Sequence, residues 1–429
     1  MGAVGNSSKR NGSLEGRRRK KLWPSWVIRL YQVALPLTWR MAWLYRRTLL
    51  RRTRVVVVVG SFGKTTTTRA VAAALGPECV GRARGNARSF IAEALVRVPP
   101  FARWTVIEAG IDRPGQMGTL ARMLRPDITV VTGIGSEHNR SLFNLGVTRY
   151  EKSKMLSALG PDGLAVLNGD DPNVLWMAQR TRARVKTYGF GAENDVRAVD
   201  FECHGLEGAT LSLVGCGTMD RLRTRLPARQ QALSLLAAFA IGREVGIPTE
   251  ILIERLSRLE AVQGRFRPVS LPSGAVLIRD EFKGAFETIE SALTALEEFP
   301  ANRRVVVMGE VSEPVGGMGP VYRAVGFHIG RTADLAVFVG RHFHRYAAGV
   351  RKYEDPPVLI DAGPDLYNAV RILEENLRSG DAVLLKGRDT QKLHRIALAL
   401  QGETVRCQVQ LCRRSTLCDH CPKVDEDPA

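Results

Sequence analysis

Short runs of apolar residues, many of them β-branched, alternate with amphipathic stretches from residue 54 to about residue 400. Both faces of each run are apolar, which is typical of strands in a parallel sheet that helices cover on both sides. The first group of predicted strands is Val55–Val59, Trp104–Ile107, Ile128–Val131 and Ala165–Leu167. The second group is Val276–Ile278, Val305–Met308, Leu335–Val339 and Ala382–Leu385. The pattern therefore predicts an α/β protein with two parallel sheets, each in its own domain.

Between these two groups the pattern changes twice. Residues 187–225 combine Asp, Asn and Gly turns with short Val and Leu stretches, which indicates a small antiparallel insertion. Residues 229–261 have a helical pattern. A chain of 429 residues is long enough for two or three domains. The predicted organisation is a disordered basic tail (1–22), a basic aromatic arm (23–53), a central domain (54–262), a C-terminal domain (263–405) and a Cys-rich tail (406–429).

Positive charge is concentrated at the start of the chain. The formal net charge is +19, and residues 1–54 carry 14 basic residues against one acid, Glu15. A protein that binds nucleic acid over its whole surface would spread such charge over the fold, so the distribution argues against a nucleic-acid partner. Seven unevenly spaced cysteines and the lack of a recognisable secretory signal favour a cytoplasmic location.

The arm interleaves aromatic residues with arginines, and Pro36 should break or kink any helix there. Tryptophan favours the headgroup layer of a membrane, and each basic residue near an anionic leaflet contributes about 1 kcal/mol. Two interpretations are open: a peripheral anchor at the inner face of the membrane, or a helix packed on the folded body with a solvated basic tail. A spanning helix is not expected, because the longest uncharged stretch is about ten residues and roughly 20 are needed. The aromatic residues are Trp23, Trp26, Tyr31, Trp39, Trp43 and Tyr45.

A glycine-rich loop follows the first predicted strand directly. Its sequence is Gly60-Ser61-Phe62-Gly63-Lys64-Thr65, and a helical run begins at Thr66. In such a loop, backbone N–H groups and a helix N-terminus face phosphate oxygens, the lysine neutralises phosphate charge and the threonine hydroxyl reaches Mg²⁺. The loop predicts an ATP and Mg²⁺ site, although Val58 stands where a standard P-loop has a further glycine. The fold class is thus a P-loop parallel-sheet ATPase domain followed by a smaller Rossmann-like α/β domain.

The shortened loop and the motifs after it resemble those of the Mur ligases, ATP-dependent amide-bond ligases of peptidoglycan assembly. The resemblance covers roughly residues 54–400, and its pattern is nearest to the branch that adds D-alanyl-D-alanine. The further matching motifs are Thr105-Val-Ile-Glu108-Ala-Gly110, Thr132-Gly-Ile-Gly-Ser-Glu-His138, Lys152, Asn168-Gly-Asp170-Asp171, Gly264-Arg265 and Lys386-Gly387-Arg388.

The resemblance implies a role for each matching residue. Glu108 and His138 would join Thr65 as metal ligands, and Lys152 would be either a metal-ligating carbamylated lysine or a helix-surface lysine. Asn168 and Asp280 would contact the nucleotide, while Lys64 and Arg265 would stabilise charge during phosphoryl transfer to a carboxylate. Lys386 and Arg388 would hold the amine substrate, against the alternative of a solvated basic loop.

The sequence departs from the family pattern in three places. Ala228–Ser234 replaces the family's Gly-x-His-Asn-x-x-Asn, and Asp280–Phe286 keeps only the acid of Asp-Ser-Tyr-Asn-Ala-Asn-Pro. Residues 1–54 are too short for the family's usual N-terminal UDP-sugar-binding domain. The expected function is therefore a ligase that joins a small or peptidyl carboxylate to an amine through an acyl phosphate. The alternatives are an amidating or polymer-extending ligase that uses a lipid-linked or free substrate, and a non-catalytic ATP-binding membrane scaffold.

Four of the cysteines lie close together near the end of the chain. Four thiolates could form a tetrahedral Zn²⁺ site, but only one Cys-x-x-Cys pair is present. Free or redox-active thiols and an iron–sulfur cluster are the alternatives. These residues are Cys407, Cys412, Cys418 and Cys421.

Overall fold

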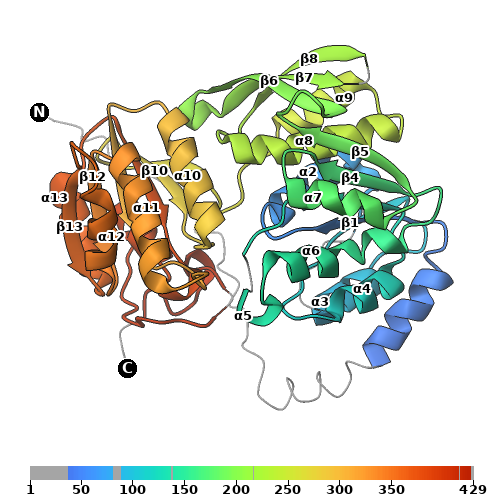
Figure 1. Ribbon diagram of the computed structural model, residues 1–429, viewed down its shortest axis with the longest axis horizontal. Coiled ribbons are helices and arrows are strands. Elements are labelled where there is room, and N and C mark those ends of the chain that lie inside the picture. Colours follow the sequence, from blue (N-terminus) through green and yellow to red (C-terminus); the bar gives the residue numbers. More distant parts are fainter. Residues whose placement is uncertain (1–36, 81–87, 137–138, 216, 415, 427–429) are drawn as a thin grey trace, which may run out of the picture.

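The strands of the protein form two sheets (Figure 1). The computed structural model describes residues 37–426 except 81–87, 137–138, 216 and 415. We call the elements around the eight-stranded sheet the large half, and those around the six-stranded sheet the small half. All eight predicted strands are found, with ends within two residues of those expected. The predicted α/β class with two parallel-dominated sheets is thereby confirmed, whereas the exact domain boundaries stay predictions.

The large sheet has the strand order β2-β1-β3-β4-β5-β6-β7-β8. Strands β2 to β6 pair in parallel, and β6, β7 and β8 pair antiparallel. The antiparallel part expected at residues 187–225 is therefore not a separate insertion, because β6 pairs with β5 and extends the sheet. The strands are β1 (Arg54–Val59), β2 (Trp104–Glu108), β3 (Ile128–Val131), β4 (Leu164–Asn168), β5 (Arg184–Gly189), β6 (Val196–Cys203), β7 (Ala209–Gly215) and β8 (Thr218–Thr224).

Helices cover both faces of the large sheet. Alternate valines of β1 face opposite ways: Val56 and Val58 pack in one core cluster, and Val55, Val57 and Val59 in the other. The first cluster includes α2 (Lys64–Leu75), α8 (Arg229–Glu244) and α9 (Thr249–Ser257). The second includes α3 (Arg88–Val96), α4 (Gln116–Leu124), α5 (Asn139–Leu142) and α7 (Pro172–Met177), and α6 (Leu145–Ser153) packs beside α4 and α7.

The small sheet has the order β13-β12-β11-β14-β10-β9, and only β9 is antiparallel to its neighbour. Helices α10 (Phe286–Glu298), α11 (Met318–Thr332) and α12 (Phe343–Val350) pack on one face. Helices α13 (Leu366–Asn376) and α14 (His394–Leu400) pack on the other. The strands are β9 (Arg267–Ser270), β10 (Val276–Asp280), β11 (Arg303–Met308), β12 (Leu335–Val339), β13 (Val358–Gly363) and β14 (Asp381–Lys386).

Two further segments pack on these halves. The first described residues, 37–47, form a helix that lies at the edge of the large half (blue in Figure 1). Its Ala42 and the following Leu50 are buried in the core cluster of β1. The C-terminal segment, residues 404–426, packs on the small half with a single short 3₁₀ turn, η6 (Cys418–His420). Among the described residues, no helix is long and apolar enough to cross a bilayer.

Candidate active site

The glycine-rich loop connects β1 to α2 and adopts the phosphate-binding form that its sequence predicts. Gly60 and Gly63 have positive φ angles of 148° and 76°. A Cβ on Gly60 would lie 2.0 Å from the Thr132 hydroxyl oxygen, so only glycine fits there. The Lys64 ammonium is buried and donates to the carbonyl oxygens of Gly60 (3.0 Å) and Ser61 (2.8 Å). The loop thus holds the lysine at the place where it can meet phosphate charge.

Thr65 and Glu108, which are 43 residues apart, meet at the carboxyl end of the large sheet. The Thr65 hydroxyl donates to Glu108 Oε2 at 2.8 Å, because β1 and β2 are parallel neighbours and both end here. The pair supplies a hydroxyl and a carboxylate oxygen, which are the hard donors that Mg²⁺ prefers. His138, the third predicted ligand, lies outside the described residues.

Lys152 lies inside the protein and not on a helix surface. Its side chain projects from α6, the residue is only 3% exposed, and Nζ donates to the hydroxyl of Ser61 at 2.8 Å. The same hydroxyl exchanges hydrogen bonds with the backbone of Gly135 (2.9 and 3.0 Å). Nearby, the Asn168 amide donates to the Thr132 carbonyl at 2.9 Å. Three segments that are distant in the sequence, residues 132–135, Lys152 and Asn168, therefore meet at or beside the loop.

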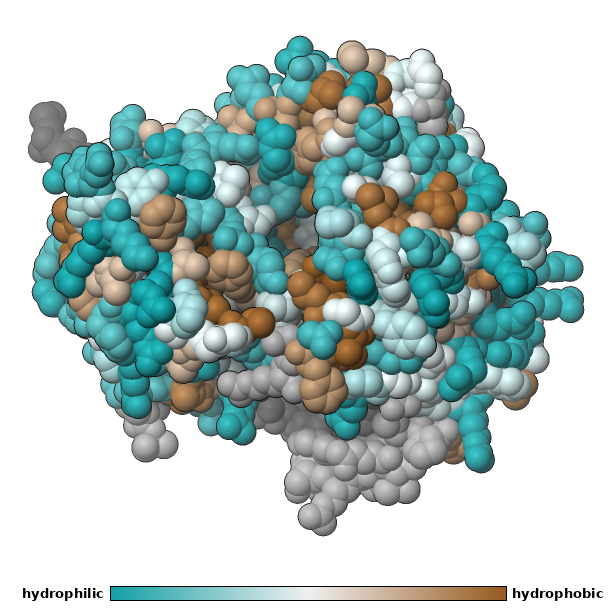
Figure 2. All heavy atoms as spheres, in the orientation of Figure 1, coloured by the Kyte–Doolittle hydropathy of each residue, from teal (hydrophilic) through white to brown (hydrophobic). Residues whose placement is uncertain are grey.

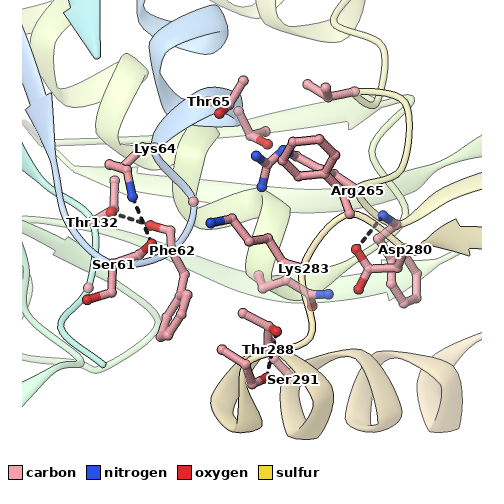
Figure 3. A pocket seen from close by; sticks show the side chains of 18 of the residues that line it. Ser61, Phe62, Lys64, Thr65, Thr132, Arg265, Asp280, Lys283, Thr288 and Ser291 are labelled. Atoms are coloured by element: carbon pink, nitrogen blue, oxygen red, sulfur yellow. Dashed lines mark hydrogen bonds between the residues drawn. The ribbon is translucent and has the colours of Figure 1, made fainter. Parts of the chain in front are cut away.

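The small half supplies the opposite wall. The Arg265 guanidinium lies over the ring of Phe282 at 4.7 Å, and in Figure 3 the Arg265 and Lys283 side chains extend toward Lys64 and Thr65. Sequence reasoning had assigned Arg265 but gave Lys283 no role. A usable signal existed, because Lys283 follows the end of β10 and ligands bind at the carboxyl ends of parallel strands.

Asp280 and Lys386, both predicted site residues, are paired with each other. They end the neighbouring strands β10 and β14, and the distance from Lys386 Nζ to Asp280 Oδ2 is 2.6 Å. Burial raises the pKa of Asp280 and lowers that of Lys386, and the attraction between the two charges opposes both shifts. Arg388 pairs with Glu310 but keeps about one third of its side chain exposed at the cavity.

A contact between the two halves was not expected from the sequence. Glu287, in the first turn of α10, accepts hydrogen bonds from the backbone N–H and the hydroxyl of Ser136, both at 2.7 Å. Ser136 belongs to the segment after β3, so the contact joins the small half to the loop that faces Lys152 and Ser61. No local sequence signal distinguishes Glu287 from other acids of an amphipathic helix.

Most of these groups line one cavity of about 990 Å³, and the surface is hollowed between the two halves (Figure 2). The volume is at the upper end for small-molecule sites. The first turn of α8 also reaches it: Gln230 and Gln231 line the cavity, and Gln231 Nε2 donates to the Arg265 carbonyl at 3.0 Å. Most of the described residues to which the sequence assigned a role in ligand binding line the cavity, and Lys152 contacts its wall, whereas Gly60 of the glycine loop does not reach it. The lining residues are 61–66 of the loop and its helix, Glu108, Asn168, Arg265, Asp280, Lys386 and Arg388.

The C-terminal cysteines do not form the predicted zinc site. In the described part of the chain there is no group of three or more His, Cys, Asp or Glu side chains that could hold a metal ion. Burial raises the pKa of the Cys418 thiol to about 12, which keeps it protonated at neutral pH. The zinc interpretation therefore has no support, and the described cysteines are free, which is the alternative with free thiols. Spacing along the chain does not by itself decide whether side chains meet in the geometry of a metal site.

Comparison with known proteins finds similarity to Mur ligases. The family model for the Mur ligase middle domain matches residues 58–242. A UDP-N-acetylmuramoyl-tripeptide–D-alanyl-D-alanine ligase of Bacillus subtilis is 27% identical over 351 residues, which make up 80% of this chain and 75% of that protein. A UDP-N-acetylmuramate–L-alanine ligase of Xylella fastidiosa is 30% identical over 267 residues, 60% of this chain and 54% of that protein.

Solved structures share the fold. MurF from Acinetobacter baumannii matches with a TM-score of 0.76 and 18% identity, covering 85% of this chain and 80% of that one. MurF ligase from Thermotoga maritima in complex with ADP matches with a TM-score of 0.75 and 20% identity, covering 86% and 84%. At such identities the likeness shows a common architecture.

Proposed function

Since the chain is a homologue of the Mur ligases and carries their middle domain at residues 58–242, we propose that it is an ATP-dependent carboxylate–amine ligase. The proposed reaction belongs to the assembly of a peptidoglycan precursor, as in the D-alanyl-D-alanine-adding relatives. One observation carries the proposal: Lys64 and Thr65 of the glycine loop face Arg265 and Lys283 across a single cavity (Figure 3).

The glycine loop is proposed to bind the triphosphate of ATP. Its backbone N–H groups and the start of α2 provide the cradle, and Lys64 exchanges its two carbonyl partners for phosphate oxygens. Thr65 and Glu108 have the donor atoms to hold Mg²⁺, which when bound neutralises charge on the phosphates. His138 stays a predicted further ligand. Asn168 is proposed to contact the nucleotide or to hold the segment that does.

The chemical difficulty is the approach of two anions. A carboxylate oxygen must attack the γ-phosphorus of ATP, after which ADP leaves and an acyl phosphate remains. Lys64, Arg265 and Lys283 place three cationic side chains around the cavity and are proposed to stabilise this approach. The amine then attacks the acyl carbon and expels phosphate. The two hydrogen bonds from Ser136 to Glu287 are proposed to keep the two halves close enough to exclude water.

Two lysines receive more specific roles. Lys152, buried against Ser61, is proposed to be the residue that CO₂ carbamylates, which would replace its cation by a metal-binding carboxylate. Lys386 is proposed to hold the Asp280 carboxylate in place. Of the two predicted substrate residues, the part-exposed Arg388 is then the one proposed to contact the carboxylate of the amine substrate.

The test is amine-dependent release of ADP by the purified full-length chain. Candidate acceptors are muramyl peptides, UDP-linked and lipid-linked, and free glutamate chains; candidate amines are D-alanyl-D-alanine, single amino acids and ammonia. Lys64→Ala should lower the rate at least 100-fold, because it removes a charge that acts in the transition state. Lys352→Ala, which removes an exposed lysine of the small half, is the matched control and should leave the rate unchanged. ATP binding without turnover for every acceptor would instead identify a nucleotide-binding scaffold.

The helix of residues 37–47 is proposed to hold the enzyme at an anionic membrane surface. Leu37, Met41 and Leu44 lie one helical turn apart on a single face and are 61%, 51% and 55% exposed. The opposite face, with Ala42 and Arg46, is buried against the large half. The apolar stripe therefore faces solvent, and the basic excess of residues 1–54 complements an anionic leaflet.

Vesicle flotation tests this contact. Wild-type protein should float with vesicles that contain phosphatidylglycerol and much less with pure phosphatidylcholine, and 0.5 M NaCl should weaken the binding. The triple change Leu37→Ser, Met41→Ser and Leu44→Ser should reduce binding at least tenfold. Leu206→Ser with Met219→Ser, which alters exposed apolar residues elsewhere, is the control. Unchanged flotation of the triple variant contradicts the proposal, as does a concentration-dependent dimer that the same variant abolishes.

A further inference from the structure

The C-terminal segment reaches the cavity although it resembles no part of the ligase motifs. Leu417 is half-buried and lines the cavity together with Arg388, Asp389 and Thr390. These three residues form the loop after β14, where the amine substrate is proposed to bind. An apolar side chain of the tail therefore lines the same cavity as the cationic group that would hold a substrate carboxylate.

Hydrogen bonds from the loop after β14 and from α14 fix the path of the segment. The Arg395 guanidinium donates to the carbonyl oxygens of Cys407 (2.5 Å) and Val409 (2.6 Å). The backbone N–H of Cys412 donates to the Thr390 carbonyl at 2.8 Å. The contacts are side chain to backbone or backbone to backbone, so they define where the segment runs with little dependence on its sequence.

One side-chain contact is specific and buried. Asp419 accepts a two-pronged ion pair from Arg279, at 2.6 and 3.0 Å, and Arg279 is only 3% exposed. The other edge of the guanidinium holds Glu281 at 2.7 and 2.9 Å. Burial alone would raise the pKa of Asp419, but its hydrogen bonds and charge pairing with Arg279 outweigh burial and lower it. Asp419 is therefore ionised at neutral pH.

The same carboxylate also contacts the connection between the two halves. Gln263 Nε2 donates to Asp419 Oδ1, and Gln263 immediately precedes Gly264 and Arg265. The Gly264 carbonyl accepts from the Phe282 N–H at 3.2 Å, which ties the connection to the end of β10. Asp419 thus lies where the tail, the connection and β10 meet.

We propose that the C-terminal segment is a wall of the active site, with Leu417 determining specificity and Asp419 acting as a positioning residue. Leu417 contacts the apolar part of an amino acid or short peptide whose carboxylate reaches Arg388. Asp419 holds Leu417 at the cavity and, through Gln263, fixes the backbone that carries Arg265. This role rests on the ligase function proposed above.

Steady-state kinetics of full-length variants test the proposal with the best amine found for the wild type. Leu417→Ala should raise the KM for the amine about five- to tenfold and leave the KM for ATP within twofold, because only the amine end loses an apolar contact. Asp419→Asn should raise the KM for the amine and also lower kcat, since Arg265 loses its support. Asp419→Glu keeps the charge and should recover part of both effects.

Glu426→Gln is the matched control, because it removes an exposed acid of the same segment; it should behave as wild type. Calorimetric titration with Mg-ATP and a melting curve show whether each variant remains folded and binds nucleotide. An unchanged KM for the amine in Leu417→Ala overturns the specificity role, as do equal changes in the KM for ATP and for the amine. If the wild type shows no amine-dependent ADP release, the ligase function itself fails, and the substrate role of Leu417 with it.

Discussion

The two segments that flank the folded body dock on it in opposite ways. The N-terminal arm inserts its own arginine: Arg46 donates to backbone carbonyls of Leu124 and Arg125 and pairs with Asp127 at 3.0 Å. The C-terminal segment instead offers an acid, Asp419, to an arginine that belongs to the body. Both arginines are buried, but their surroundings differ.

The surroundings explain what each contact can do. Arg46 reaches the carbonyl groups that end α4, which have no partner within the helix, so its role is to complete a helix terminus far from the cavity. Asp419 joins two pieces of backbone that lead to site residues. A terminal segment that only stabilises the fold and one that shapes a site can thus use the same type of ion pair. The difference lies in the backbone that each ion pair holds: the end of α4 for the arm, and the connection that leads to Arg265 for the C-terminal segment.

The largest effect should come from Arg46→Ala. The change leaves helix-end carbonyls without a donor and removes the charged partner of Asp127, so we expect a loss of about 3–4 kcal/mol in the free energy of unfolding. Urea unfolding of the full chain measures it. Arg46→Lys keeps the charge but cannot contact several carbonyls at once, so its free energy of unfolding should lie between those of the wild type and Arg46→Ala. A loss below about 1 kcal/mol would mean that the arm contributes little to the body.

The buried His394 of α14, which packs against the C-terminal segment, should make the free energy of unfolding fall at acid pH, and we expect no such effect from the contact of the arm. His394 is fully buried, and burial, followed by the charge of Arg279, lowers its pKa from 6.5 to about 3. The unfolded chain then binds the proton more readily, so this contribution to stability is present above pH 6.5 and is lost as pH falls toward 3. At pH 4.5 this effect should make the free energy of unfolding about 2–3 kcal/mol lower than at pH 7.

His394→Phe checks this assignment. Phenylalanine fills similar space and does not titrate, so the fall in unfolding free energy between pH 7 and pH 4.5 should shrink by about that amount. Both ring nitrogens of His394 lack a hydrogen-bond partner among the described residues, so the substitution breaks no such bond. An identical pH dependence in wild type and variant would assign the acid sensitivity to carboxylates elsewhere.

The smallest effect is expected on the exposed side of the arm. Arg47 lies over the ring of Trp43 at 3.9 Å and donates to the Arg122 carbonyl at 3.1 Å. Because this stack is open to solvent, Arg47→Ala should cost about 0.5–1 kcal/mol. The same urea titration measures it beside Arg46→Ala. A cost equal to that of Arg46→Ala would show that burial is not what distinguishes the two arginines.

Much of the fold and part of the site could be predicted from the chain alone. The strand of five valines and the loop from Gly60 to Thr65 are contiguous, so hydrophobic pattern and turn chemistry were enough to find them. Glu108 was predictable because it ends a strand of the same parallel sheet. The pairing of Lys386 with Asp280 was not, since each residue was assigned to a different ligand and only their neighbouring strands bring them to 2.6 Å.

The C-terminal segment shows what could not be predicted from the sequence. Four cysteines close in sequence left a zinc site open as one of three interpretations, and among the described residues no group of three or more ligating side chains could hold a metal ion. Leu417 and Asp419 carried no signal, and they lie at the cavity and beside the connection that leads to it.

What this sequence settles by itself is local: where strands and helices form, where glycine permits a phosphate-binding turn, and where charge accumulates. Those properties depend on neighbouring residues, whose spacing the backbone fixes. The tertiary structure alone decided which side chains meet across the cavity, which of two arginines is buried, and that Leu417 of the C-terminal segment lines the cavity. These outcomes depend on packing between segments hundreds of residues apart, whose relative placement no local pattern encodes.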